Sequence, residues 1–129
     1  MRYERHDPLA ELQSVADAAT IVTLQADVRE IHVNEDVRRY ILTIARNTRT
    51  HEAVQLGVSP RGTLALYRAS QALAALRGRT YVIPSDVKQL CAPVLTHRIH
   101  IGAQTRLRGR TPAQIIGEIA ESTPAPVVS

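Results

Sequence analysis

The chain has 129 residues, one cysteine and no phenylalanine or tryptophan, and its 16 basic residues outnumber 12 acidic ones to give a net charge of +4. The length suits one domain. A single cysteine excludes an intramolecular disulfide and fits a reducing compartment, and no apolar run approaches the roughly 20 residues of a membrane span. We therefore expect a cytoplasmic protein with a core of Leu, Ile, Val and Ala, which favours packed helices. The charge permits nucleic-acid binding without indicating it.

The N-terminal part predicts a strap followed by a helix. Residues 1–8 are polar, and Asp7-Pro8 suits the start of a short turn because Asp is a good N-cap and Pro a good first helical residue. Apolar residues at helical spacing then predict a helix from about Asp17 to Arg29, namely Ile21, Leu24 and Val28. Two short extended stretches, Ile31–Val33 and Tyr81–Ile83, are expected to pair as strands.

The second predicted helix follows Asn34 as its N-cap and has the clearest apolar face in the chain. That face consists of Val37, Tyr40, Ile41, Ile44, Ala45 and Thr48. A connector over residues 47–57 leads to the third helix, where Ser59 is the expected N-cap and Pro60 the first helical residue. Alanines along this helix suggest a close neighbour, and Gly78 is the expected left-handed C-cap.

The C-terminal part predicts a fourth helix, a long connector and a short last helix. The fourth helix runs from Pro84 to about Thr96, with a kink expected at Pro93. The connector covers residues 97–110, and the last helix begins at Thr111-Pro112 with a capping box. Residues 122–129 are expected to form a flexible tail. The predicted fold is mainly α: a small bundle of four principal helices plus a short C-terminal helix and two very short strands.

The sequence carries no complete catalytic or metal-binding set. It has no Gly-rich phosphate-binding motif and no C-x-x-C. His97 and His100 lack a third ligand nearby, so solvent-facing side chains are expected there and no metal site. Cys91 lies on the apolar face of its predicted helix and is expected to be an inert core thiol.

Arg61 is placed against the usual preference of a helix start, because first turns carry partial positive charge and favour acids. Position alone is compatible with a solvated side chain. The alternative is an arginine that meets an anion, since free N–H groups and a guanidinium together bind phosphate well. In that case Pro60 fixes the direction of the side chain and Gly62 keeps the approach open. The residues leave both interpretations standing.

Several motifs at fixed spacing bear on this choice. They are G-x-S-P-R at 57–61, R-G-R-x-Y-V at 77–82, P-x-D-V at 84–87 and V-L-x-H-R at 94–98. Together they resemble the C-terminal lid domain of MoxR-family AAA+ ATPases, relatives of magnesium-chelatase ATPase subunits. The resemblance extends through residues 7–12 and 107–116 and covers nearly the whole chain. Val58 stands where Ala is common, and Ile83 replaces a Thr at the cost of an N-cap.

The resemblance implies that residues 1–129 form one AAA+ lid and that Arg61 is the sensor-2 residue, which reaches the γ-phosphate of ATP. The segment nearest the nucleotide would be Gly57, Val58, Ser59, Pro60, Arg61 and Gly62. ATP and Mg²⁺ would be bound by the intact ATPase, whose core domain would lie upstream with its Walker motifs. The chain alone is then expected to be inactive and to bind no cofactor of its own.

Implied partners are the upstream core domain, neighbouring protomers in a hexameric ring and von Willebrand factor A-domain proteins, in chaperone-like work on partner proteins. The alternatives are a basic helical nucleic-acid-binding module, which a steep salt dependence of DNA binding would favour, and a free-standing adaptor. Arg46 and Arg49 either complement a helix C-terminus or face another subunit. The loop with Arg106, Arg108 and Arg110 is either solvated or contacts a partner.

Overall fold

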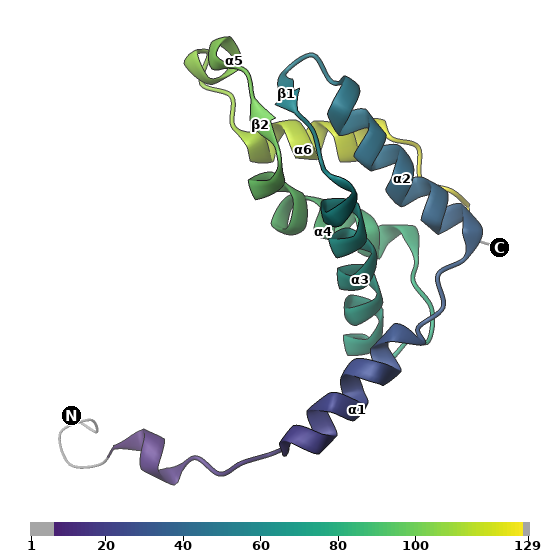
Figure 1. Cartoon of the computed structure of the whole chain (residues 1–129), viewed down its shortest axis with the longest axis vertical. Helices are drawn as coiled ribbons and strands as arrows, with labels where there is room; N and C mark the ends of the chain where they lie inside the picture. The colour runs from purple at the N-terminus through teal and green to yellow at the C-terminus, as the bar shows by residue number, and fades with distance from the viewer. Residues whose placement is uncertain (1–6, 128–129) are drawn as a thin grey trace.

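The structure is a computed structural model, and it describes residues 7–127. Four helices, α2, α3, α4 and α6, gather into one body, and α1 extends away from it towards the N-terminal end (Figure 1). The elements in chain order are η1 (Pro8–Glu11), α1 (Ala18–Arg29), α2 (Glu35–Thr50), β1 (Val54–Leu56), α3 (Pro60–Leu76), α4 (Pro84–Leu95), η2 (Thr96–Arg98), β2 (His100–Ile101), α5 (Ala103–Leu107) and α6 (Pro112–Ser122). The mainly helical fold expected from the sequence is confirmed.

Side-chain caps set the helix starts where the sequence predicted them. The side chains of Asn34, Ser59 and Thr111 accept hydrogen bonds from backbone N–H groups in the first turns of α2, α3 and α6. Asp7 caps the short 3-10 helix η1 in the same way. After α3, Gly78 has a φ of 70°, a left-handed conformation that glycine adopts at no steric penalty. These local signals confirm the predicted boundaries.

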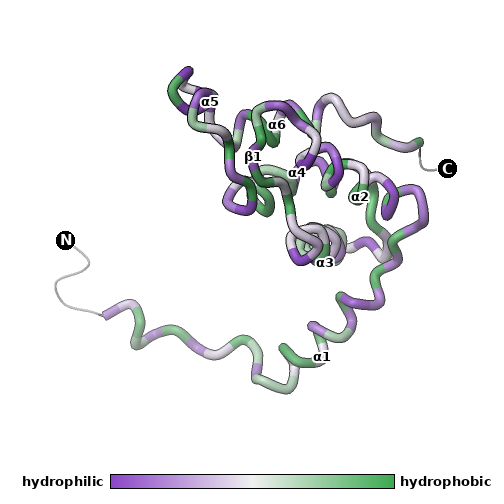
Figure 2. Tube along the Cα trace, turned by 45° about the horizontal axis from the view of Figure 1, so that its top comes forward, coloured by the Kyte–Doolittle hydropathy of each residue, from purple (hydrophilic) through white to green (hydrophobic). Residues whose placement is uncertain are grey.

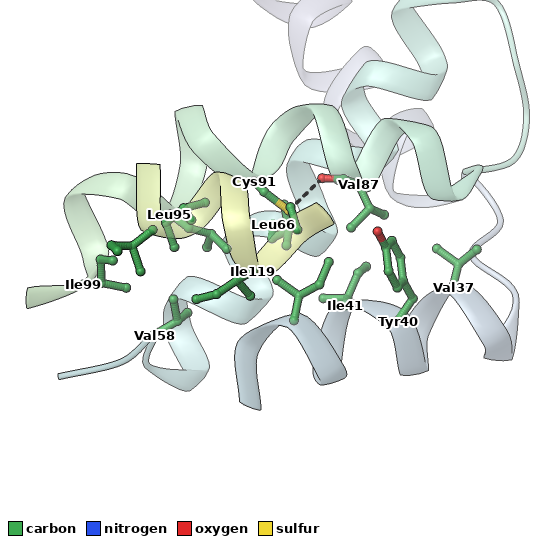
Figure 3. Close-up of a cluster of buried hydrophobic side chains, with 14 of the residues drawn as sticks. Val37, Tyr40, Ile41, Val58, Leu66, Val87, Cys91, Leu95, Ile99 and Ile119 are labelled. Atoms are coloured by element: carbon green, nitrogen blue, oxygen red, sulfur yellow. Dashed lines mark hydrogen bonds between the residues drawn. The ribbon is translucent and has the colours of Figure 1, made fainter. Parts of the chain in front are cut away.

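The core lies between α2, α3, α4 and α6. The face of α2 predicted from its spacing is buried in full, and it meets α4 and α6. Figure 3 shows Ile41, Leu66, Val87 and Ile119 converging from these four helices. Cys91 lies in the same cluster and its thiol donates to the Val87 carbonyl at 3.2 Å. The expected core position of this cysteine is confirmed, and burial raises the pKa of its thiol to about 11.

The sequence predicted one pairing of extended segments and missed the two-stranded sheet. Ile31–Val33 and Tyr81–Ile83 do lie side by side, but they meet in one parallel bridge between His32 and Tyr81. The two-stranded sheet is antiparallel and joins β1 to β2, with Val54 opposite Ile101. Both strands fall in segments predicted to be connectors, because strands of two or three residues are too short to show a periodicity. The second of these connectors also contains the short helix α5.

Helix α1 packs little of its surface on the rest of the chain. None of its residues is buried, and Ile21, Val22 and Leu24 are 47%, 64% and 52% exposed. Figure 2 shows hydrophobic stretches of α1 outside the body of the molecule. The end of α1 is held by Gln71 of α3, whose buried amide donates to the carbonyls of Arg29 and Ile31 at 3.1 and 2.8 Å.

The remaining differences concern the chain ends. Thr123 falls in the tail expected to be flexible, yet it is buried and its hydroxyl accepts from the Asn47 side chain at 2.9 Å. Most of the predicted strap of residues 1–8 lies outside the described residues, as do 128 and 129.

Helix α4 continues through Pro93 to Leu95, and the kink there stays a prediction. Within residues 7–127 the helices are all too short or too polar to cross a membrane.

Candidate functional site

The candidate site is the loop Gly57–Gly62, which joins β1 to α3. Ser59 caps the helix by accepting from the Gly62 N–H at 3.2 Å, and Pro60 occupies the first helical position. Arg61 follows in the first turn and is exposed. Its side chain makes no hydrogen bond or ion pair with any residue from 7 to 127. The guanidinium is therefore available to a partner outside the described chain.

Hydrogen bonds to two residues in the last turn of α2 hold the loop in place. The buried Thr48 hydroxyl accepts from the Val58 N–H at 2.9 Å and donates to the Ala45 carbonyl at 2.6 Å. The carbonyl of Val58 is also bonded, because Arg49 Nε donates to it at 2.9 Å. Val58 is also fully buried. Its side chain therefore packs in the core, and both its backbone polar groups are hydrogen-bonded within the lid.

The two glycines of the loop are required by close packing. A Cβ on Gly57 would lie 2.6 to 2.8 Å from atoms of Arg49, two of them backbone. A Cβ on Gly62 would lie 2.7 Å from Val58 Cγ1 and 3.2 Å from Arg98 Cδ. The expectation that Gly62 keeps an approach open for a ligand is wrong: the residue is buried, and the space above it is filled by Val58 and by the stem of Arg98.

A hollow of about 370 Å³ lies beside the loop, and this volume was not foreseen from the sequence. Its lining contains three basic residues and no acidic one. The residues that line it are Arg49, Leu56, Gly57, Val58, Ser59, Pro60, Arg98 and His100. The structure thus brings Gly57 to Pro60 together with basic groups from η2 and β2, whereas Arg61 and Gly62 are not part of this lining. The G-x-S-P-R motif supplies Gly57 to Pro60 of this lining, and the V-L-x-H-R motif ends at Arg98, although its spacing alone did not place Arg98 beside the loop.

A second polar cluster accounts for the R-G-R and P-x-D motifs. Asp86 is completely buried, and its carboxylate accepts from Arg77 at 2.9 Å and from Arg79 at 2.6 and 2.8 Å. It also accepts from the Ile83 N–H at 3.0 Å, which stabilises the start of α4 although Ile83 has no capping oxygen. Burial raises the pKa of Asp86, but the hydrogen bonds from Arg79 and Ile83 and the two charges outweigh it and hold the pKa below its usual value. These motifs are structural.

The other basic residues have different surroundings. Arg46 lines an apolar groove of about 470 Å³ between α2 and α3, together with Arg38 and Arg49. Arg110 pairs with Glu118 of α6, and that hydrogen bond lowers the pKa of the Glu118 carboxyl. The predicted solvated loop is therefore anchored at one end, while Arg106 and Arg108 are exposed. Residues 7–127 contain no group of three metal-ligating side chains.

A small helical body with a short antiparallel ribbon and a rigid Ser-Pro-Arg helix start has the features of the lid that accompanies an AAA+ ATPase core. The family model of the AAA lid domain matches residues 46–119, which is more than half of the chain. The chain belongs to this family.

Relatives agree with this assignment. The protein YeaC of Bacillus subtilis (strain 168) is 36% identical over 124 residues, which cover 96% of this chain and 39% of YeaC. The chaperone MoxR1 of Mycobacterium tuberculosis is 26% identical over 128 residues, 92% of this chain and 34% of MoxR1. The crystal structure of a putative ATPase from Cytophaga hutchinsonii has the same fold, with a TM-score of 0.84 at 22% identity over 89% of this chain and 38% of that one. The chain is thus a MoxR-like lid and spans less than two-fifths of the length of each of these proteins.

Proposed function

We propose that this lid serves a MoxR-type AAA+ ATPase and that Arg61 is its sensor-2 residue, the group that contacts the γ-phosphate of ATP. The observation that carries the proposal is the exposed guanidinium of Arg61, unpaired within residues 7–127, in the first turn of a helix whose start is fixed by Thr48 and Arg49. A cation at that end of a helix is unfavourable alone and is stabilised when a phosphate arrives.

The residues present fit part of a nucleotide site. Arg61 offers a planar pair of donors to a phosphate oxygen, and the loop Gly57–Gly62 presents a rigid edge beside it. The triphosphate and Mg²⁺ would be held by a core domain with its own phosphate-binding loop. The lid's contribution is electrostatic: a fixed positive charge that stabilises charge on the γ-phosphoryl group and distinguishes ATP from ADP. The chain alone would not hydrolyse ATP.

The assembly belongs to the same proposal. AAA+ lids work beside a core domain, and we infer that this lid packs on its own core and against neighbouring protomers in a hexameric, cytoplasmic ring. Relatives include a protein named as a chaperone, which supports chaperone-like remodelling of partner proteins, among them von Willebrand factor A-domain proteins. Rotation of the lid relative to that core would be absorbed in the chain before α1.

The test is Arg61→Gln in an ATPase that carries this lid. We expect the rate of ATP hydrolysis to fall on the order of 10²-fold, as when one charge-stabilising donor is removed from a transition state. The melting temperature of the isolated lid should not change, because the side chain is exposed and makes no hydrogen bond or ion pair with residues 7–127. Arg108→Gln, an exposed arginine outside the loop, is the control. Unchanged hydrolysis, or an equal loss of stability in the lid, would contradict the assignment.

A further inference from the structure

The hollow beside the loop Gly57–Gly62 is lined by basic side chains and by no acidic one. Its basic groups come from three separate parts of the chain: Arg49 from α2, Arg98 from η2 and His100 from β2. None of these side chains forms an ion pair within residues 7–127. By contrast, Arg77, Arg79 and Arg110 all have a carboxylate partner. The two guanidinium charges have no counter-ion within residues 7–127 and repel each other, so this arrangement favours an anion in the hollow.

Both arginines are held in place before any ligand arrives. Arg49 Nε donates to the Val58 carbonyl at 2.9 Å, and Arg98 Nε donates to the Val94 carbonyl at 3.0 Å. Each bond uses one donor and leaves the terminal nitrogens of the guanidinium without a partner within residues 7–127. The stem of Arg98 also rests above Gly62, where any side chain would displace it. Two oriented guanidinium groups lose little conformational freedom when they bind tetrahedral oxygens.

The two backbone contacts alone would give these residues a purely structural role, since arginines near the ends of α2 and α4 complement the helix dipoles. That role does not explain why Arg49 and Arg98 line the same hollow with His100 and without an acidic residue. We propose that this hollow binds a phosphate group, with Arg98 and Arg49 as its principal ligands. The source of that phosphate rests on the proposed function: it would be a nucleotide bound beside the lid. Free phosphate is the other source of the same chemistry.

The test is an NMR titration of the 129-residue chain at pH 7 and constant ionic strength, with inorganic phosphate, tripolyphosphate and ATP as separate probes. We expect saturable shifts of the backbone amides that line the hollow, those of Gly57, Val58, Ser59 and His100. Arg98→Gln should weaken tripolyphosphate binding at least about fivefold, the order expected for hydrogen bonds to a charged group. Arg108→Gln removes the same charge outside the hollow and should change the affinity less than about twofold, by long-range charge alone.

The three probes separate the sources. Binding of tripolyphosphate and ATP with weaker binding of inorganic phosphate supports a nucleotide, whereas equal affinity for inorganic phosphate supports free phosphate. Because Arg98→Gln also removes the contact to Val94, its folding is checked by thermal melting. His100→Gln provides a second variant, since this side chain is exposed on β2.

Shifts that do not saturate, or equal weakening by Arg98→Gln and Arg108→Gln, would overturn the proposal in favour of non-specific attraction. The outcome for the sensor-2 assignment is separate. If hydrolysis depends on Arg61 and the hollow binds nothing, only the present inference fails. If the hollow binds phosphate while Arg61→Gln leaves hydrolysis intact, the sensor-2 assignment fails and the hollow remains an anion site.

Discussion

Asp86 illustrates how single residues hold this domain together. It is the one charged residue fully buried within residues 7–127, and taking a carboxylate out of water is unfavourable unless it is paired and hydrogen-bonded. Arg79 and Arg77 supply the charges, and the Ile83 N–H supplies a further donor. The cluster ties the end of α3 to the start of α4, so the R-G-R motif acts on stability at a distance from the loop of Arg61.

Replacing Asp86 with Asn should therefore destabilise the chain. We expect a loss of about 2–3 kcal/mol near pH 7, below the range for a fully buried pair because both arginines can turn towards water. The pKa of Asp86 is lowered in the folded state, so its contribution is complete above the unfolded value of about 4 and is lost as the pH falls through the folded one. The difference between the native chain and Asp86→Asn should shrink below about pH 4 accordingly.

Urea unfolding from pH 7 down to pH 2 measures this difference. Asp27→Asn is the matched control, because Asp27 is exposed and its side chain makes no hydrogen bond or ion pair with residues 7–127. A constant difference between the native chain and Asp86→Asn across this range would show that the charge of Asp86 contributes nothing, and that the loss comes from packing alone.

At the scale of elements, the long helices and the pairing of His32 with Tyr81 could be predicted, whereas α5 and the sheet of β1 and β2 could not. A helix start is signalled within about four residues, by Asn34 or by Ser59-Pro60, and an apolar face such as that of α2 repeats over several turns. The ribbon of β1 and β2 depends on contact between Val54 and Ile101, far apart in the chain. The same holds for the hollow: Arg61 was found from a local motif, whereas Arg98 and His100 reach the loop only through the packing of α4 and β2.

Two glycines inside helices offer a paired test of this packing. A Cβ on Gly62 would meet Val58 Cγ1 at 2.7 Å, whereas one on Gly117 of α6 would meet nothing within 4 Å. Gly62→Ala should therefore lower the free energy of unfolding by about 1–2 kcal/mol through overpacking. Gly117→Ala should raise it by about 0.5–1 kcal/mol, because Ala restricts the unfolded chain and favours the helix.

The two variants are compared by the midpoint of urea unfolding at unchanged slope. The prediction about Gly62 depends on the direction of the shift, and Gly117→Ala shows what the same substitution does without a neighbour. Stabilisation by both variants would mean that Val58 and the stem of Arg98 move aside easily, and that the loop is less rigid than its hydrogen bonds indicate.

At the scale of the whole molecule, α1 is distinguished from the other long helices by its exposure. It carries Ile21, Val22 and Leu24 on its surface, no residue in it is buried, and its end is tied to α3 through Gln71. The family model begins at residue 46, so α1 and most of α2 lie outside the matched part of the lid, and of these two helices only α1 lacks buried residues. A helix of 12 residues with little tertiary contact is marginal in water, which makes the isolated chain a body of four helices with one weakly held arm.

Hydrogen exchange of the isolated chain should show this division. We expect the amides of α1 to exchange by local opening at a small fraction of the global free energy of unfolding, with Val28, the one half-buried residue of α1, the most protected among them. The amides of α2, which lie against the core through Ile41 and Ile44, should require global unfolding. Measurements at two protein concentrations provide the control, because association through the exposed side chains of α1 would raise protection with concentration. Protection of α1 equal to that of α2 in the dilute sample would mean that the contacts with α3 are stronger than the exposure of Ile21 and Leu24 indicates.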